Sequence, residues 1–193
     1  MSERIALLTA AAFGALALTA AVVAPVNAQD KMTKSESSGE KTVMVGGAAM
    51  FPSKNIIQNA VNSKDHTTLV AAVKAAGIVT TLEGKGPFTV FAPTNAAFAK
   101  LPAGTVDTLV KPENKATLTK ILTYHVVAGK LEASDLTDGK KLKTVQGEEL
   151  TVKRSGDTVM IIDSKGGSST VTIPNVIQSN GVIHVVDTVL MPS

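Results

Sequence analysis

Residues 86–102 read GPFTVFAPTNAAFAKLP, and this stretch decides how the rest of the chain is arranged. Residues 88–92 are aromatic and β-branched, which favours a short buried β-strand. Pro93 has no amide hydrogen to donate to a neighbouring strand and is therefore expected to end this one. Thr94 is a good N-cap for a helix that carries Phe98 on its inner face. The sequence thus predicts a strand that passes directly into a helix, with the other elements packed around the pair.

The N-terminus has the features of a secretory signal peptide. Arg4 supplies a positive charge, residues 5–23 are apolar and rich in Ala, and residues 26–28 form a small-residue cleavage site. The apolar run is nearly long enough to span a bilayer, so an uncleaved membrane anchor is the alternative. We expect residues 1–28 to be removed, which predicts a secreted protein, periplasmic or extracellular and at the cell surface. Contact with the membrane would then be limited to the signal peptide before cleavage.

The remainder of the chain is predicted to be a linker followed by one domain. Residues 29–51 are predicted to be a flexible N-terminal linker, because residues 29–41 contain almost no apolar side chain. For residues 42–51, TVMVGGAAMF, a strap across the domain is the alternative. Residues 52–193 are long enough for one domain of ordinary size.

Composition excludes several classes of protein. The chain has no Cys, so no disulfide can form and stability must come from the core. The formal net charge is only +3, and the Lys-rich residues 140–165 are interleaved with Asp and Glu. Nucleic acid is therefore not an expected partner. The cluster at residues 140–143 is interpreted as a solvated hairpin face, with binding of a polysaccharide or an acidic surface as the alternative.

Helical patterns come first along the chain. Residues 55–62 predict a short helix, and a longer one follows with Asp65 as its expected N-cap. Gly77 is expected to end that helix in the left-handed conformation of a Schellman motif. Pro112 favours the start of another helix, and residues 133–136 are expected to add one helical turn.

Strand patterns follow the helices. Asn180 and Gly181 form the strongest short hairpin signal in the chain and predict a type I′ turn. Residues 182–186 are apolar on both faces, so this strand is expected at the centre of the sheet. Helices followed by an antiparallel meander predict an α+β domain. The predicted strands are residues 142–145, 150–154, 159–163, 171–178 and 182–190.

The chain offers little support for catalysis or for a bound metal. A nucleophilic site would need Cys or a G-x-S-x-G turn, and neither occurs. The three histidines, His66, His125 and His184, lack HxH or HExxH spacing. We therefore expect no enzymatic activity, no metal and no cofactor.

His125 admits two interpretations. It continues an apolar helical face with Leu118, Ile121 and Leu122, which favours a buried ring hydrogen-bonded to a backbone carbonyl. Alternatively, Tyr124 and His125 belong to a recognition surface, since Tyr is enriched at interfaces. His184 lies inside an apolar strand and is expected to be structural.

Three segments carry a resemblance to a known family. Residues 86–95 with Phe98 resemble the first signature of the fasciclin (FAS1) domain. Residues 122–127, LTYHVV, resemble its tyrosine–histidine segment, and residues 180–187, NGVIHVVD, its closing signature. They occur in the family's order across residues 52–193, as in the small single-domain secreted bacterial members. The residues of this structural signature are Phe88, Pro93, Thr94, Asn95, Phe98, Asn180, Gly181 and His184.

The resemblance implies a fold and a function. It implies a wedge of antiparallel β-sheets flanked by several α-helices, in a non-catalytic module for cell-surface or extracellular-matrix adhesion. In animal members the tyrosine–histidine segment is associated with integrin binding. The candidate interaction surface in this chain is then Tyr124, His125, Ile121 and Leu122.

The identity of the partner stays open at this point. A cell-surface or matrix protein and a polysaccharide are both candidates. A single domain cannot bridge two surfaces, so weak homo-oligomerisation, tethering through residues 29–41, or binding of a soluble ligand is expected. Some proteins of this fold resemble carriers of apolar pigments, and a carotenoid in a groove between helices and sheet is therefore the alternative function.

Overall fold

The computed structural model describes residues 41–193. They fall within one compact unit, Ser37–Ser193. The predicted signal peptide (1–28) and the predicted linker as far as residue 40 lie outside the described residues. The elements are β1 (Val43–Val45), β2 (Ala48–Met50), α1 (Ile56–Ala60), the 3₁₀ helix η1 (Lys64–His66), α2 (Thr67–Ala76), α3 (Val79–Glu83), β3 (Phe88–Pro93), α4 (Asn95–Ala99), α5 (Thr105–Leu109), the 3₁₀ helix η2 (Pro112–Asn114), α6 (Lys115–Tyr124), β4 (Val126–Ala128), β5 (Lys141–Lys143), β6 (Glu149–Ser155), β7 (Thr158–Ile162), β8 (Ser168–Gln178) and β9 (Gly181–Val186).

The main sheet has seven strands in the order β4-β3-β9-β8-β7-β6-β5. Strand β9 lies inside this order and all of its residues are buried, which confirms the central strand predicted from its apolar pattern. The meander from β5 to β9 is antiparallel, as predicted. The β3–β9 pair is parallel, whereas the sequence predicted antiparallel sheets only. After β3 the chain passes through helices to β4, which pairs with one side of β3 antiparallel, and the meander then brings β9 to the other side of β3 in the parallel direction.

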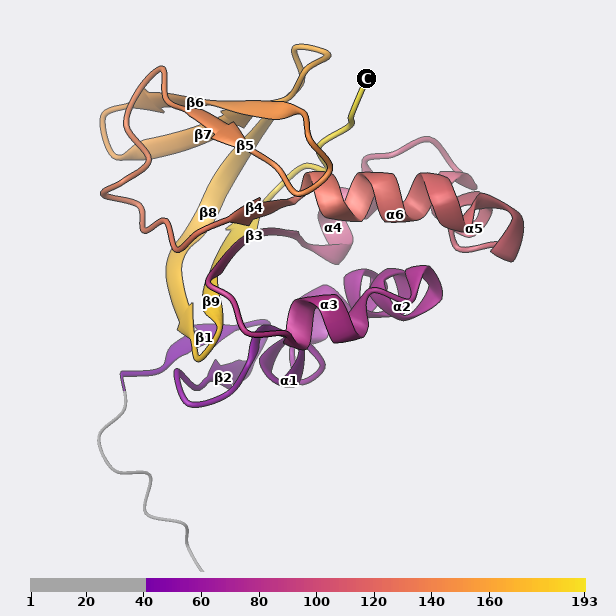
Figure 1. Ribbon diagram of the computed structural model, residues 1–193, viewed down its shortest axis with the longest axis horizontal. Helices are drawn as coiled ribbons and strands as arrows, with labels where there is room; N and C mark the ends of the chain where they lie inside the picture. The colour runs from indigo at the N-terminus through magenta and orange to yellow at the C-terminus, as the bar shows by residue number, and fades with distance from the viewer. Residues whose placement is uncertain (1–40) are drawn as a thin grey trace, which may run out of the picture. The chain divides into compact units, whose positions relative to one another are not determined.

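The two ends of this sheet approach each other. A single bridge joins Val127 of β4 to Thr144, just after β5, and the Val145 amide donates to the Val126 carbonyl at 2.7 Å. Strands β5, β6 and β7 therefore curl over β4, while the helices pack on the other side (Figure 1). The result is the predicted α+β wedge, with its sheet partly closed.

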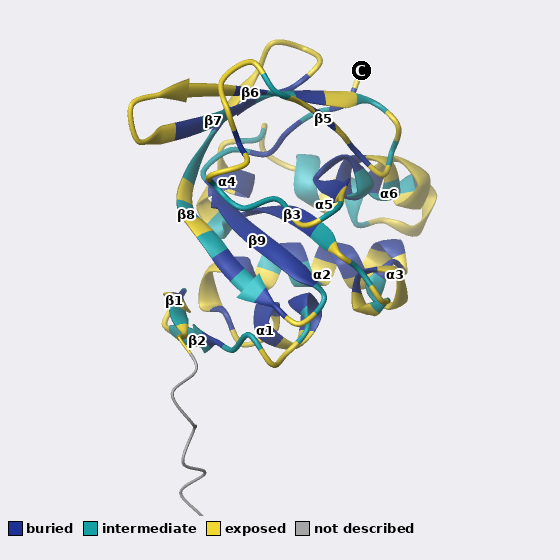
Figure 2. Cartoon of the chain, turned by 60° about the vertical axis from the view of Figure 1, so that its left-hand side comes forward, coloured by how far each residue is buried: buried dark blue, intermediate teal, exposed yellow. Residues whose placement is uncertain are grey.

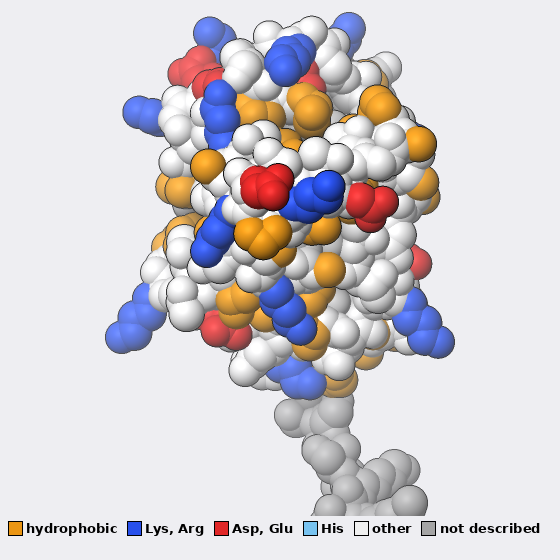
Figure 3. Space-filling model, turned by 90° about the vertical axis from the view of Figure 1, so that its right-hand side faces the viewer, with side chains coloured by type: hydrophobic (Ala, Val, Ile, Leu, Met, Phe, Trp, Pro, Cys, Tyr) orange, Lys and Arg blue, Asp and Glu red, His pale blue; other side chains and the backbone are white. Residues whose placement is uncertain are grey.

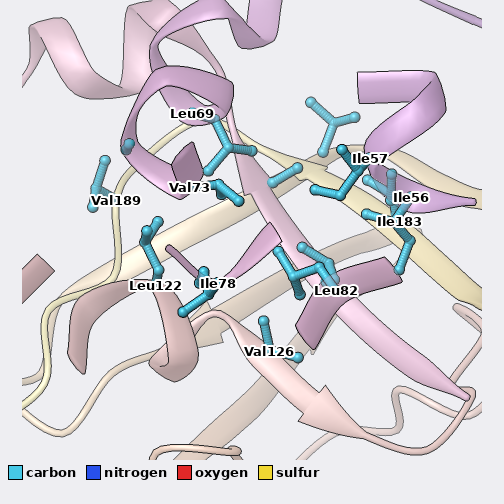
Figure 4. Packing of buried hydrophobic residues seen from close by; sticks show 14 of the residues in the cluster. Ile56, Ile57, Leu69, Val73, Ile78, Leu82, Leu122, Val126, Ile183 and Val189 are labelled. Carbon is cyan, nitrogen blue, oxygen red and sulfur yellow. The ribbon is translucent and has the colours of Figure 1, made fainter. Parts of the chain in front are cut away.

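One apolar cluster lies between the helices and the sheet. Leu69 and Val73 of α2 face Leu122 of α6 and Ile183 of β9 in this cluster (Figure 4). These contacts follow from the helical spacing of the apolar residues, which places them on one face. In the part of the chain that is described, none of the helices is both long and apolar enough to cross a bilayer.

A second apolar cluster fills the curved part of the sheet, and the residues at its centre are fully buried (Figure 2). It joins β3 and β9 to the meander and to the C-terminal end of α6. Its buried members are Phe91, Tyr124, Val127, Leu136, Leu142, Leu150, Val152, Val159, Ile161, Val186 and Leu190.

The predicted boundary between linker and domain needs a correction. Residues 43–50 form the β1–β2 hairpin, and Val45 and Met50 are buried in the first cluster. The Lys64 amide donates to the Gly46 carbonyl at 3.2 Å, which holds the hairpin tip against η1. Residues 42–51 therefore belong to the domain, because two apolar side chains of this segment pack into the first cluster.

Two predicted helix ends are confirmed. The Ala97 amide donates to the Thr94 hydroxyl at 3.2 Å, so Thr94 is the N-cap of α4. Gly77 has φ +74° at the end of α2, and the Ile78 amide donates to the Val73 carbonyl at 3.3 Å. These bonds satisfy groups that a helix end leaves free, which is why local sequence predicts them.

Other local predictions are wrong. Asp65 lies within η1 and does not cap α2. Instead the Asn95 side-chain oxygen accepts from the Thr68 amide at 3.0 Å, so the start of α2 is bonded by a residue of α4. Residues 133–136 contain a turn and no helix.

Candidate functional site

The predicted interaction surface is not a surface in this structure. The exposed fractions of Tyr124, His125, Ile121 and Leu122 are 0%, 2%, 5% and 4%. Helix α6 turns this face toward the sheet, and the chain passes directly from α6 into β4. The expectation of an exposed tyrosine–histidine surface is therefore corrected, and these side chains cannot reach a partner while the fold is intact.

His125 is instead a hydrogen-bonded core residue, as its apolar helical face predicted. The Leu190 amide donates to His125 Nε2 at 3.0 Å, so Nδ1 carries the proton and donates to the Ile121 carbonyl at 2.8 Å. Burial in apolar surroundings lowers the pKa of His125 to about 4. The neutral ring thus ties α6 to the segment that follows β9.

Tyr124, the last residue of α6, is also fixed by a hydrogen bond to a distant backbone group. The Ser164 amide donates to the Tyr124 hydroxyl at 2.9 Å, within the turn between β7 and β8. The ring itself lies in the second apolar cluster. Tyr124 therefore joins α6 to the meander.

Replacing His125 with Ala is expected to lower the free energy of unfolding by about 2 kcal/mol. Two backbone groups, at Ile121 and Leu190, would lose their partner inside the core. Thermal unfolding of the full chain, followed by circular dichroism, measures the effect. Thr117→Ala, an exposed change on the same helix, is the control and should leave the melting temperature nearly unchanged. A normal melting temperature with lost cell attachment would instead favour a recognition role for His125.

Asn180 does more than form a turn. Its side-chain nitrogen donates to the Leu82 and Gly84 carbonyls at 2.7 and 3.2 Å, and its side-chain oxygen accepts from the Ile56 amide at 3.1 Å. Among the described residues that are not Gly, only Asn175 has positive φ, so the predicted type I′ turn at Asn180 is wrong. The side chain fastens the β8–β9 turn to α1 and to the end of α3.

Gly181 is required by close approach of two strands. A Cβ atom at this position would lie 2.0 Å from the Phe88 carbonyl oxygen, in the parallel β3–β9 pair. A Cβ atom added at Gly86 would likewise lie 2.0 Å from the Asn180 carbonyl oxygen. The two glycines of the signature therefore let β3 and the β8–β9 turn touch through their backbones.

His184 is structural, as predicted. The Asn175 amide donates to its Nδ1 at 3.4 Å, and its Nε2 donates to the Leu131 carbonyl at 2.8 Å. Its ring stacks on Phe91 with centroids 5.7 Å apart. The remaining signature residues are also part of the fold: Phe98 and Pro93 are buried, and Phe88 packs against the first cluster.

The interior offers little room for a ligand. A small apolar cavity of about 30 Å³ lies between the helices and the sheet, bordered by His66, His125 and apolar side chains. Drug-sized ligands occupy sites of roughly 300–1,000 Å³. The groove expected there for a carotenoid is thus filled by the core itself. His66 shares a hydrogen bond of 2.9 Å with the Ser63 hydroxyl through Nδ1, and its buried Nε2 has no partner among the described residues.

An open groove of about 580 Å³ lies at one end of the β3–β9 pair. Sequence reasoning treated its parts as separate turns, and only the fold brings them together. Lys85 and Lys130 contribute the positive charges at its border. The lining residues are Asn55, Gln58, Glu83, Gly84, Lys85, Gly86, Pro87, Lys130, Gln178, Ser179, Asn180 and Gly181.

The described residues contain no group of three or more His, Asp or Glu side chains that could hold a metal ion. Both ring nitrogens of His125 and His184 are engaged by the backbone. The arrangement of the signature residues is therefore one of packing and hydrogen bonding within the domain.

Comparison with known proteins places the chain in a family. The model of the Fasciclin domain family matches residues 64–192, so this chain belongs to that family. The chain is similar to a structure of a FAS1 domain pair from the insect cell adhesion molecule fasciclin I. The TM-score is 0.65 at 19% identity, over 73% of this chain and 52% of that one, which supports the fold alone.

Relatives occur in bacteria and in an animal. Protein sll1483 of Synechocystis is 48% identical over 79% of this chain and 82% of its own length. Immunogenic protein MPB70 of Mycobacterium bovis is 35% identical over 100% of this chain and 98% of its own length. The transforming growth factor-beta-induced protein ig-h3 of Sus scrofa is 37% identical over 72% of this chain, which corresponds to 20% of that relative.

Proposed function

We propose that this chain is a non-catalytic interaction module that acts at the cell surface or in the extracellular matrix. The observation that carries the proposal is that the signature residues make hydrogen bonds within the domain. The polar signature side chains Asn95, Asn180 and His184 bind the chain's own backbone. A reaction centre needs polar groups that are free to meet a substrate. The signature residues are engaged inside the domain, so the outer surface is left for binding.

The relatives support a location outside the cytoplasm. The structural relative is described as a cell adhesion molecule. Cell surface glycolipoprotein MPB83 of Mycobacterium bovis is 40% identical over 77% of this chain and 64% of its own length. The signal-peptide pattern in residues 1–28 favours export of this chain as well.

Adhesion by one domain requires a second point of attachment. Weak self-association, or tethering through residues preceding β1, would supply it. The partner on the other side is a cell-surface or matrix protein or a polysaccharide. Residues of the helical face and of the outer sheet surface are available for such contacts, whereas the tyrosine–histidine segment is not.

A cell-attachment assay tests this proposal. Surfaces coated with the purified full chain should retain cells of the organism that produces it, and surfaces coated with heat-denatured chain should not. An absorbance spectrum of the same sample, purified from that organism, controls for the pigment-carrier alternative. A coloured sample without attachment would overturn the proposal, as would turnover of a substrate abolished by changing one polar side chain.

A further inference from the structure

The outward side of strands β5 to β8 forms an exposed surface, which we call the outer sheet face. Exposed or partly exposed residues alternate with buried ones in β5, in residues 149–153 of β6, in β7 and in residues 168–170 of β8 (Figure 2). Since successive side chains of a strand point to opposite sides, the exposed ones share a face. The outer sheet face consists of Lys141, Lys143, Glu149, Thr151, Lys153, Met160, Ile162, Ser168 and Thr170.

The strand register orders these residues in rows. One row runs from Lys141 through Thr151 and Ile162 to Ser168, and a second from Lys153 through Met160 to Thr170. Neighbours within a row are about 5 Å apart, and rows are about 7 Å apart. Each row begins with a lysine and continues with hydroxyl and aliphatic side chains. The surface thus presents lysine ammonium groups along one side, and hydroxyl and aliphatic side chains lie beside them.

Most nearby carboxylates are engaged away from this face. Asp163 is buried and accepts from the Gly167 amide at 2.7 Å. Asp138 accepts from the Arg154 amide at 2.7 Å, and Glu148 accepts from the Ser164 hydroxyl at 2.8 Å. These three carboxylates are engaged in hydrogen bonds of turns and loop segments, and Asp157 adds an exposed carboxylate in the β6–β7 turn at the end of this face.

The face therefore keeps a positive excess. Glu149 is its one acidic member: it lies opposite Lys143 in the register, and its carboxylate pairs with the Lys141 ammonium at 3.5 Å. Lys143 and Lys153 form no ion pair within the part of the chain that is described, and both are exposed. Two unpaired ammonium groups remain beside a platform that can receive hydroxyl groups and aliphatic CH groups.

We propose that the outer sheet face binds an acidic polysaccharide, which deepens the proposed function and rests on it. Carboxylate or sulfate groups of the polymer would pair with Lys143 and Lys153. Its sugar hydroxyls would meet Thr151 and Thr170, and its CH groups would lie on the aliphatic side chains. An anionic bilayer is less well matched, because recognition of lipid usually requires 4–8 clustered Lys or Arg, and Glu149 lies among the lysines here.

The helical side of the molecule provides a matched comparison. On the face seen in Figure 3, basic side chains are spread out and interspersed with acidic ones. Lys74 on α2 and Lys111 after α5 are exposed and lie outside the outer sheet face. Neutralising these two changes the net charge as much as neutralising Lys143 and Lys153 does.

The experiment measures binding of the full chain to immobilised polygalacturonate, with neutral dextran as the reference polymer. The wild-type chain should bind polygalacturonate in low salt, release it as salt rises, and ignore dextran. The double substitution Lys143→Gln with Lys153→Gln should weaken binding about tenfold. Lys74→Gln with Lys111→Gln should leave it within about twofold. Melting temperatures verify that all variants fold.

Each other outcome overturns this assignment. Equal weakening by both pairs would indicate attraction by net charge alone. Equal binding to dextran would remove the role of acidic groups, and binding to phosphatidylglycerol vesicles but not to polygalacturonate would indicate a lipid surface. Failure of this proposal is distinguishable from failure of the proposed function. If the Lys143 and Lys153 variant still retains cells on coated surfaces, adhesion holds and uses another face.

Discussion

Gly181→Val is expected to abolish folding of the domain or lower its stability by at least ~4 kcal/mol. The first added carbon would lie 2.0 Å from the Phe88 carbonyl oxygen. To relieve this steric clash, β3 and β9 would have to separate. Both strands have a neighbouring strand on each side, and nearly all of their residues are buried. No flexible side chain can move aside here, because the atom that is struck belongs to the backbone.

Thermal unfolding of the full chain measures this effect, and Ser179→Ala is the matched control in the same turn. Ser179 is exposed, and the hydrogen bond from its backbone amide to the Lys54 carbonyl does not depend on its side chain. The melting temperature should therefore stay nearly constant. A second variant, Asn180→Gly, distinguishes a turn that needs a positive φ at this position from a turn that is held by the Asn180 side chain. Asn180→Gly would be tolerated in a type I′ turn, but here it removes the hydrogen bonds to Ile56, Leu82 and Gly84. A Gly181→Val chain with wild-type melting behaviour would contradict the close approach of these strands.

Mild acid is expected to destabilise the domain through its three buried histidines. Burial lowers the pKa of His125 from 6.5 to about 4, and burial also lowers the pKa values of His66 and His184. Between the folded and the unfolded pKa, the unfolded chain binds more protons than the folded chain does. The contribution of these neutral histidines to the free energy of unfolding is therefore fully present above pH 6.5 and decreases as the pH is lowered toward 4. His125 alone accounts for on the order of 3 kcal/mol of this loss.

Melting temperatures between pH 7 and pH 4.5 measure the acid effect. Glu148 contributes little in that window. Hydrogen bonds from the Ser193 amide and the Ser164 hydroxyl lower the pKa of Glu148 to about 2, so its contribution is lost only below its unfolded value. His125→Ala should show a weaker dependence on pH, because it lacks one of the titrating groups. A melting temperature that stays constant from pH 7 to pH 4.5 would contradict the neutral, buried state of these rings.

Several features were predictable because their causes are local. Thr94 caps the helix that begins beside it, and Gly77 ends the helix that precedes it. Residues 182–186 were identified as a central strand because apolar side chains on both faces exclude an exposed position. Each of these predictions depends on residues within one or two turns or strand repeats, which the sequence displays directly.

The candidate site was less predictable because its parts are distant in sequence. Asn180 and Leu82 are 98 positions apart, and His125 and Leu190 are 65 apart. Tyr124 was predicted to lie at an interface because Tyr is enriched there and because the family segment is associated with binding, but the Ser164 amide satisfies its hydroxyl inside the domain. The outer sheet face depends in the same way on the register of four strands, which the alternating pattern of any one strand does not specify.

From the sequence alone we could identify the family, the central strand at residues 182–186, the ends of two helices and the antiparallel meander. Hydrophobic periodicity and capping chemistry act over a few residues, so a linear pattern is enough to reveal them. Only the tertiary structure decided that the tyrosine–histidine segment is buried, that Gly86 and Gly181 admit a backbone contact, and that lysines from β5 and β6 share one face. These outcomes depend on which distant segments meet, and that is set by the packing of the whole domain.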